Sequence, residues 1–202
     1  SYWTRSPGDH PDAIVEDLKT WNAELRSEHV QINTCKLWAD GTFMSGGALL
    51  LSPCCGHAPD DRGAMTFPPE NIEAQIEAVQ VAGFDMHIHI DGDGSARVVL
   101  DAYEKVLRRQ TTRSGPGKPR HVLAHNSMVD PADLGRYAQM GVIANCTPLW
   151  GTDYNGQYRD IYTAMLGAER VEERLFPYGD LVRSGAVVTY GSDIPGVDLP
   201  EI

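Results

Sequence analysis

The sequence predicts an α/β protein built on a parallel β-sheet, and three observations support this. Short apolar runs typical of buried strands alternate with longer segments of helical periodicity. In such an alternation each helix carries the chain back across the sheet, so successive strands lie parallel through right-handed crossovers. Polar residues follow several of the apolar runs, and parallel α/β folds gather their chemistry at the carboxyl ends of strands.

The first half of the chain contains two predicted helices and two predicted strands. In the segment 12–26, apolar residues from Ile14 to Leu25 recur at helical spacing and form one face. The segment 69–83 has proline at its start and ends at Gly83, as helices commonly do. Apolar runs predict strands at 31–40 and 84–90.

The second half continues the same alternation. A helix is predicted at 95–110, and the segment 167–185 is predicted to be mostly helical. A further helix at 130–141 has Asp130 as its N-cap and proline in its first position. Strands are predicted at 120–126, 142–148 and 186–193. Five parallel strands with helices between them fit either a doubly wound sheet or part of a (β/α)₈ barrel.

The composition is that of a protein with an ordinary hydrophobic core, because 42% of its 202 residues are apolar and 22% are charged. The net charge of −11 argues against a nucleic-acid partner, since no basic stripe is present to neutralise phosphates. No apolar run approaches the roughly 18 residues of a membrane span, and no signal segment opens the chain. We therefore expect a cytoplasmic protein without a membrane partner, with export of a longer precursor as the alternative.

The four cysteines do not form a metal-binding or redox motif. None belongs to a C-x-x-C pair, and Cys54 and Cys55 are adjacent, which suits neither a zinc knuckle nor an easy disulfide. The cysteines are therefore expected to be free thiols of a reducing compartment.

Side chains able to bind a metal ion stand at the ends of several predicted strands. His87 and His89 share one face of their strand, because side chains alternate along a strand with a period of two. His125 and Asp193 stand at equivalent points of two later strands. Imidazole nitrogens and a carboxylate from separate strands suit a divalent metal, which lowers the pKa of a bound water towards about 7. A carboxylate beside that water can accept its proton and pass it to a leaving amine.

The glycine turn after these histidines permits a second interpretation. The sequence GDGSA at 92–96 lies between a predicted strand and a predicted helix, as a dinucleotide-binding turn does. The fingerprint of that turn ends in a third glycine, whose place is taken here by Arg97. Nucleotide binding is therefore the weaker of the two hypotheses.

Three segments resemble consecutive parts of the amidohydrolase superfamily: MHIHIDGDGS, RHVLAHNSMVDPADLGRYAQMGVIANCTPLW and VVTYGSDIPG. They are most similar to amidohydrolase family 3, the branch of metal-dependent amide hydrolases with YtcJ-like and AepA-like members. That branch reads V-H-x-x-G-D after its fifth barrel strand, a histidine near the end of the sixth, and G-S-D-x-P after the eighth. The resemblance runs from about residue 31 to the end of the chain.

The resemblance implies a partial TIM (β/α)₈ barrel, about strands 4 to 8 with their helices, so that residues 1–202 form the C-terminal part of a metal-dependent hydrolase barrel domain. It implies that His89 and His125 are metal ligands and that Asp193 is both a ligand and the catalytic acid and base. Lys36, in CKLWADG, matches a fourth-strand lysine that in many relatives is carbamylated and bridges two metals; a strand-edge lysine is the alternative. His87 is expected to support these ligands, and Asp40 to hold the loop after its strand.

The implied function is metal-dependent hydrolysis of carbon–nitrogen bonds of the amide type by metal-activated water. The cofactor is then one or two divalent ions, with zinc the expected metal, and the partner a small-molecule amide. Trp150 and Tyr154, in a predicted loop at 148–160, are candidates for a substrate wall, with loop packing as the alternative.

Relatives complete their metal site with an H-x-H motif on the first strand, and the only H-x-H here lies in the middle of the chain. We therefore expect a fragment of a longer enzyme. The alternative is a non-catalytic fragment or regulatory relative without a complete metal site. The unclosed sheet also predicts association with another chain, such as a homo-oligomer.

Overall fold

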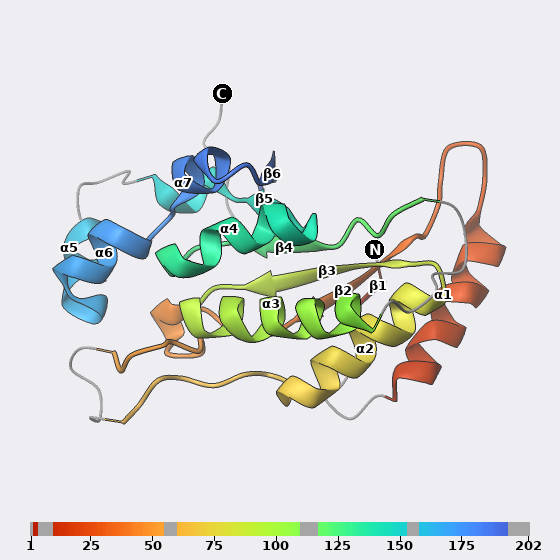
Figure 1. The fold of residues 1–202 in the computed structure, drawn as a ribbon, viewed down its shortest axis with the longest axis horizontal. Coiled ribbons are helices and arrows are strands. Elements are labelled where there is room, and N and C mark those ends of the chain that lie inside the picture. The colour runs from red at the N-terminus through yellow and green to blue at the C-terminus, as the bar shows by residue number, and fades with distance from the viewer. Residues whose placement is uncertain (1, 4–9, 55–59, 110–116, 153–157, 194–202) are drawn as a thin grey trace.

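The computed structural model describes residues 2–3, 10–54, 60–109, 117–152 and 158–193 (Figure 1). These residues form one parallel sheet whose six strands follow one another in chain order. The strands are β1 (Tyr2–Trp3), β2 (Thr34–Trp38), β3 (Asp85–Ile90), β4 (Val122–His125), β5 (Ile143–Cys146) and β6 (Val187–Tyr190).

Helices connect the strands, and Figure 1 shows α3 and α4 side by side in front of the sheet. The α-helices are α1 (Pro11–Leu25), α2 (Pro69–Val81), α3 (Asp93–Arg108), α4 (Pro131–Met140), α5 (Tyr158–Leu166), α6 (Ala168–Arg174) and α7 (Tyr178–Arg183). Two short 3₁₀ helices, η1 (Phe43–Ser45) and η2 (Pro148–Gly151), follow β2 and β5. Sequential parallel strands with helices on one face confirm the predicted partial TIM-barrel-like architecture.

The register of the sheet separates a core face from a polar face. One register row aligns four fully buried apolar side chains, namely Leu37, Ile88, Leu123 and Ala144. These side chains belong to the main core, together with helical residues such as Ile76 and Leu100. Because successive side chains point to opposite faces, Lys36, His87 and His89 lie on the other side of the sheet.

Three of the predicted boundaries need correction. The sheet has a sixth strand, β1, whose two residues are too few to give an alternating pattern. The predicted loop at 148–160 contains η2 and the first turn of α5, where Tyr158 begins the helix. The predicted helical segment 167–185 is two helices, because the chain bends at Phe176, which has a φ of 47°.

A second, smaller cluster of apolar side chains lies beyond the carboxyl ends of the strands. We call it the outer cluster, and its buried members are Phe43, Ala48, Leu50, Met128, Tyr162 and Leu166. It joins the segment after β2 to α5. The thiol of Cys54 donates to the Met165 carbonyl at 2.8 Å, which adds a polar link between the same two parts.

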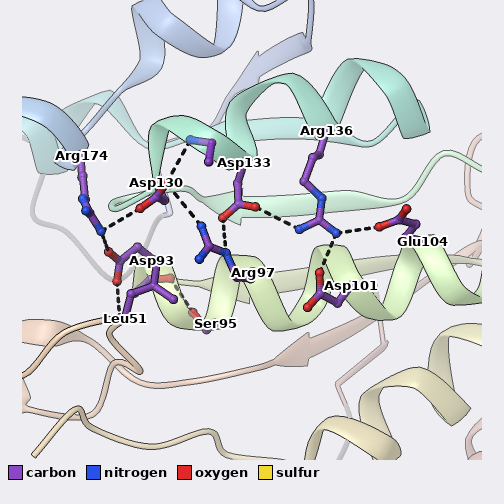
Figure 2. A network of polar contacts seen from close by, with 12 residues as sticks. Leu51, Asp93, Ser95, Arg97, Asp101, Glu104, Asp130, Asp133, Arg136 and Arg174 are labelled. Carbon is purple, nitrogen blue, oxygen red and sulfur yellow. Dashed lines mark hydrogen bonds and ion pairs between the residues drawn. The ribbon is translucent and has the colours of Figure 1, made fainter.

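Ion pairs hold α3, α4 and α6 together (Figure 2). Arg97 on α3 donates to Asp133 on α4 at 2.9 Å. From α6, Arg174 reaches Asp93 at 2.8 Å and Asp130 at 2.9 Å. These ion pairs thereby fix the first turns of α3 and α4 to each other and to α6.

Among the described residues, no helix is both long enough and apolar enough to span a membrane.

Candidate metal centre

His89 and His125 come together at the carboxyl ends of β3 and β4. Their ring centroids lie 4.6 Å apart, and the two residues are only 5% and 4% exposed. In the register, His125 is aligned with Ile90, so regular strand alternation would turn its ring towards the helices. His125 and Asn126 instead have φ values of 72° and 54°, an uncommon backbone for residues other than glycine. This turn brings the ring of His125 against that of His89.

The ring of His125 is held from two sides. Its Nδ1 is hydrogen-bonded to the hydroxyl oxygen of Thr147 at 3.0 Å. Its face stacks on Trp150, with ring centroids 4.3 Å apart and planes only 3° from parallel. Thr147 is itself fixed, since its carbonyl accepts a hydrogen bond from the Tyr178 hydroxyl at 3.1 Å. The bond at Nδ1 leaves Nε2 as the ring nitrogen of His125 that can bind a ligand.

The Nε2 atom of His89 is buried and has no hydrogen-bond partner within the part of the chain that the structure describes. Asp40 Oδ1 lies 3.8 Å from it, too far for a hydrogen bond. Burial, together with the nearby Lys36 ammonium, lowers the pKa of His89 to about 4. Burial and the charge of His89 lower the pKa of His125 to about 2. Both rings are therefore neutral at pH 7, the form in which imidazole binds metals.

Asp40 organises the backbone around the histidines. Its carboxylate accepts hydrogen bonds from the amides of Leu49 at 3.1 Å, Asp91 at 3.0 Å and Gly92 at 3.0 Å. Burial raises the pKa of Asp40 to about 7. These bonds join the end of β2, the following loop and the turn after β3. The prediction that Asp40 holds the loop after its strand is confirmed.

The glycine turn serves the packing of the chain on itself. A Cβ atom at Gly92 would lie 1.9 Å from the carbonyl oxygen of Leu49, so only glycine fits. The same carbonyl accepts hydrogen bonds from the amides of Gly94 and Ser95 at the start of α3. Asp93 Oδ1 accepts one from Leu51. The helix start where a dinucleotide would place its phosphates is thus filled by residues of the loop, which removes the basis of the nucleotide-binding hypothesis.

Lys36 and Asp193, the two other predicted ligands, lie in different surroundings. Lys36, on β2, is 6% exposed and aligned with His87. Burial lowers the pKa of Lys36 to about 8, and the Asp193 carboxylate partly opposes this shift. Asp193 follows β6, is exposed and has a φ of 57°. The structure therefore places Lys36 within electrostatic reach of Asp193 and of both histidines.

The described residues do not contain a group of three or more His, Cys, Asp or Glu side chains close enough to hold a metal ion. His87 has a buried Nε2 atom without a hydrogen-bond partner, and burial lowers its pKa to about 4. His121, by contrast, accepts from the Met86 amide at 3.0 Å and pairs with Gln80, so it is structural. The roles of Lys36, His89, His125 and Asp193 as ligands stay predictions.

The sequence also predicts Trp150 and Tyr154 as candidates for a substrate wall. Trp150 lies at the site, stacked on His125, whereas Tyr154 lies outside the described residues. Thr147 is a site residue that the sequence places at a strand end but to which the sequence pattern assigns no role. Its position directly after a strand was the available signal, but the pattern did not reveal that its hydroxyl meets His125.

Comparison with known protein families identifies the family of this chain. A family model described as "Amidohydrolase family" matches residues 7–201. The chain belongs to the amidohydrolase family. The resemblance predicted from the strand-end motifs is therefore confirmed.

Two curated relatives match most of this chain. Protein LONG AFTER FAR-RED 3 of Arabidopsis thaliana is 26% identical over 183 residues, which cover 91% of this chain and 30% of that protein. Exoenzymes regulatory protein AepA of Pectobacterium carotovorum subsp. carotovorum is 27% identical over 193 residues, covering 92% and 37%. This amidohydrolase chain thus spans about a third of the length of the curated relatives it matches.

Solved structures share the fold at lower identity. An uncharacterised metal-dependent hydrolase from Pyrococcus furiosus superposes with a TM-score of 0.71 at 21% identity, covering 91% of this chain and 36% of that one. An ochratoxinase from A. niger superposes with a TM-score of 0.54 at 13% identity, covering 96% and 39%. These likenesses show the barrel-type fold of the amidohydrolase chain.

Proposed function

We propose that this chain forms part of a metal-dependent hydrolase that cleaves amide-type carbon–nitrogen bonds with metal-activated water. One observation carries the proposal. Two buried, neutral imidazoles, His89 and His125, meet at neighbouring strand ends with their rings 4.6 Å apart. Membership of the amidohydrolase family and the structural similarity to a metal-dependent hydrolase from Pyrococcus furiosus support it.

The donor chemistry fits a divalent metal. A buried polar atom without a partner costs about 1–3 kcal/mol, and His89 Nε2 is such an atom. His125 is oriented through the bond at Nδ1, as metal-binding histidines usually are through their second nitrogen. The bound metal would supply Lewis acidity and lower the pKa of a water molecule. The two histidines are two ligands of one or two ions, with zinc the metal we expect.

The remaining residues take roles set by their positions. Asp193 would be both a ligand and the base that accepts the proton of the attacking water and returns it to the departing nitrogen. Lys36, once its neutral amine has added carbon dioxide and lost a proton, would offer a carbamate oxygen to the metal; its pKa of about 8 leaves part of its amine unprotonated at neutral pH, the form that this addition needs. Trp150 would shield the outer face of His125 from water and line the substrate site.

Metal content per chain, measured by elemental analysis after purification without chelator, tests the proposal. We expect near-stoichiometric divalent metal in the unchanged chain and a loss of most of it in His125→Ala. His87→Ala is the matched control, because it removes a neighbouring histidine that we do not assign as a ligand, and it should keep the metal.

Two outcomes would contradict the assignment. Equal losses in His125→Ala and His87→Ala would show that the ligand histidine is wrongly chosen. Absence of metal from the unchanged chain, together with no hydrolysis of small amides after zinc is added, would favour a relative without catalytic function.

A further inference from the structure

A pocket of about 300 Å³ lies beyond the end of β5, next to the candidate metal centre. We call it the aromatic pocket, and its lining includes Trp150, Thr152, Tyr162, Val171, Leu175 and Phe176. Its volume lies within the usual range for sites that bind small molecules. Trp150, which lines the pocket, is the same residue whose ring stacks on His125.

The wall formed by Phe176 is held at an energetic cost. Phe176 has a φ of 47°, and positive values are true outliers for bulky side chains. The Phe176 amide donates to the Ser127 carbonyl at 2.7 Å, and Leu175 forms a β-bridge with Met128. Both contacts attach this wall to the segment that directly follows His125. Strained residues fixed in this manner are concentrated at functional sites.

Close packing keeps the pocket next to the histidine. A Cβ atom at Gly151 would lie 3.3 Å from the ring of Phe176, so the segment carrying Trp150 approaches that ring closely. The rings of Tyr162 and Phe176 meet edge to face with centroids 5.9 Å apart. The pocket walls therefore come from η2, α5, α6 and the bend between α6 and α7.

The lining indicates what kind of group would bind. Aromatic and aliphatic side chains dominate it, and Arg159, the cationic residue among the described lining residues, is already paired with Glu172. A charged ligand would have to compete with that pair, whereas a neutral ring would bury apolar surface against the walls.

We propose that the aromatic pocket receives an uncharged aromatic group of the amide substrate, next to the bond that is cleaved. This inference rests on the proposed function, since it assigns a substrate class to the same centre. The ring of Trp150 then contacts both the ring of His125 and the aromatic ring of the substrate.

Binding of two matched probes tests the pocket without relying on hydrolysis. N-acetylphenylalaninamide and N-acetylglycinamide differ by one benzyl group, and their dissociation constants are measured by calorimetry on the full chain in the presence of a chelator. We expect the benzyl probe to bind about tenfold more tightly or better, as burial of a ring allows. Val171→Phe, which fills the pocket, should abolish this preference. Val182→Phe, at an exposed position of α7 outside the lining, should retain it.

A second variant covers the case in which Val171→Phe does not fold. Thr152 is exposed at the edge of the pocket, so Thr152→Phe fills it with little effect on the core and should also remove the preference. Equal binding of the two probes, or a preference that survives in the filled variants, would overturn the proposal.

Hydrolysis of the same two amides by the metal-loaded protein separates this inference from the proposed function. A pocket-dependent preference in binding with no hydrolysis of either amide would contradict the proposed function alone. Hydrolysis of both amides with equal kcat/KM would contradict the pocket alone.

Discussion

The two histidines and Asp193 stand at corresponding ends of parallel strands, yet their surroundings differ sharply. His89 and His125 are about 95% buried, and the residues that hold the ring of His125 are Thr147, directly after β5, and Trp150 of η2. Asp193 follows β6, where Val187 and Tyr190 are 61% and 63% exposed, and is itself exposed. The described contacts therefore build the histidine pair into the fold, while they leave the aspartate at its margin.

This contrast separates two kinds of effect. Changes around the histidine pair should alter stability and metal affinity together, because the same hydrogen bonds serve both. A change at Asp193 should alter chemistry with little effect on stability.

Asp193→Asn should show the largest effect, in activity and metal affinity but not in stability. Loss of a general base typically lowers rates by about 10²–10⁴-fold, so we expect kcat for amide hydrolysis by the full-length enzyme to fall by about a thousandfold. The thermal midpoint should stay within a degree or two, since the residue is exposed. An Asn variant with normal kcat would remove Asp193 from the mechanism.

Asp40→Asn should affect the fold directly. An amide group at this position cannot accept all three backbone hydrogen bonds from Leu49, Asp91 and Gly92, so at least one buried N–H faces another donor. We expect the free energy of unfolding to fall by about 2–4 kcal/mol in urea denaturation. Asp12→Asn, on the exposed side of α1, is the control and should change it by less than about 0.5 kcal/mol.

If Asp40→Asn were no more destabilising than Asp12→Asn, the three backbone bonds would not be what holds the turn after β3. A large loss of stability without any change in metal affinity would contradict the coupling of the two that burial implies.

The sequence was sufficient to predict β2 to β6 and the helices α1 to α4 in order, because the signals for these strands and helices are local. Asp130 caps α4 and accepts from the Ala132 amide, as its position before a proline predicted. The sequence pattern did not predict the helix α5. Its apolar face is short, and it packs mainly on the outer cluster. Tertiary contacts, and not the local sequence pattern, determine whether such a segment forms a helix.

The site was predictable in its residue types and not in its geometry. Strand alternation would place His125 on the wrong face, and only the positive φ of His125 and Asn126 turns the ring towards His89. The glycine turn looked compatible with nucleotide binding because the approach of Leu49 to Gly92 joins segments more than forty residues apart. Backbone geometry of this kind is set by distant contacts that a single sequence does not display.

Thr147→Val should weaken metal binding and, because it breaks a buried hydrogen bond, also lower the free energy of unfolding by about 1 kcal/mol. The substitution keeps the shape of the side chain and removes the hydroxyl that orients His125 through Nδ1. Loss of such an orienting partner typically lowers metal affinity 10–100-fold, and we expect about that change in a competition titration with a chelating dye. Thr152→Val, which removes a hydroxyl without contact to His125, is the control. Equal affinities in the two variants would show that Thr147 does not position the histidine.

Arg136→Met should give the smallest effect, and it tests how firmly α4 is attached to α3. The Arg136 guanidinium donates to Asp133 at 3.0 Å and to Asp101 at 2.7 Å, and its side chain is 18% exposed (Figure 2). Ion pairs that form a network and are partly shielded from water contribute more to stability than isolated surface pairs do. We therefore expect a loss of about 1 kcal/mol in the free energy of unfolding. Arg183→Met breaks a single pair with Asp180 that is largely exposed, and should cost less than half of that. A similar loss in both variants would mean that the network between α3 and α4 adds no stability beyond that of its separate pairs. The sheet alone would then align the strand ends that carry His89 and His125.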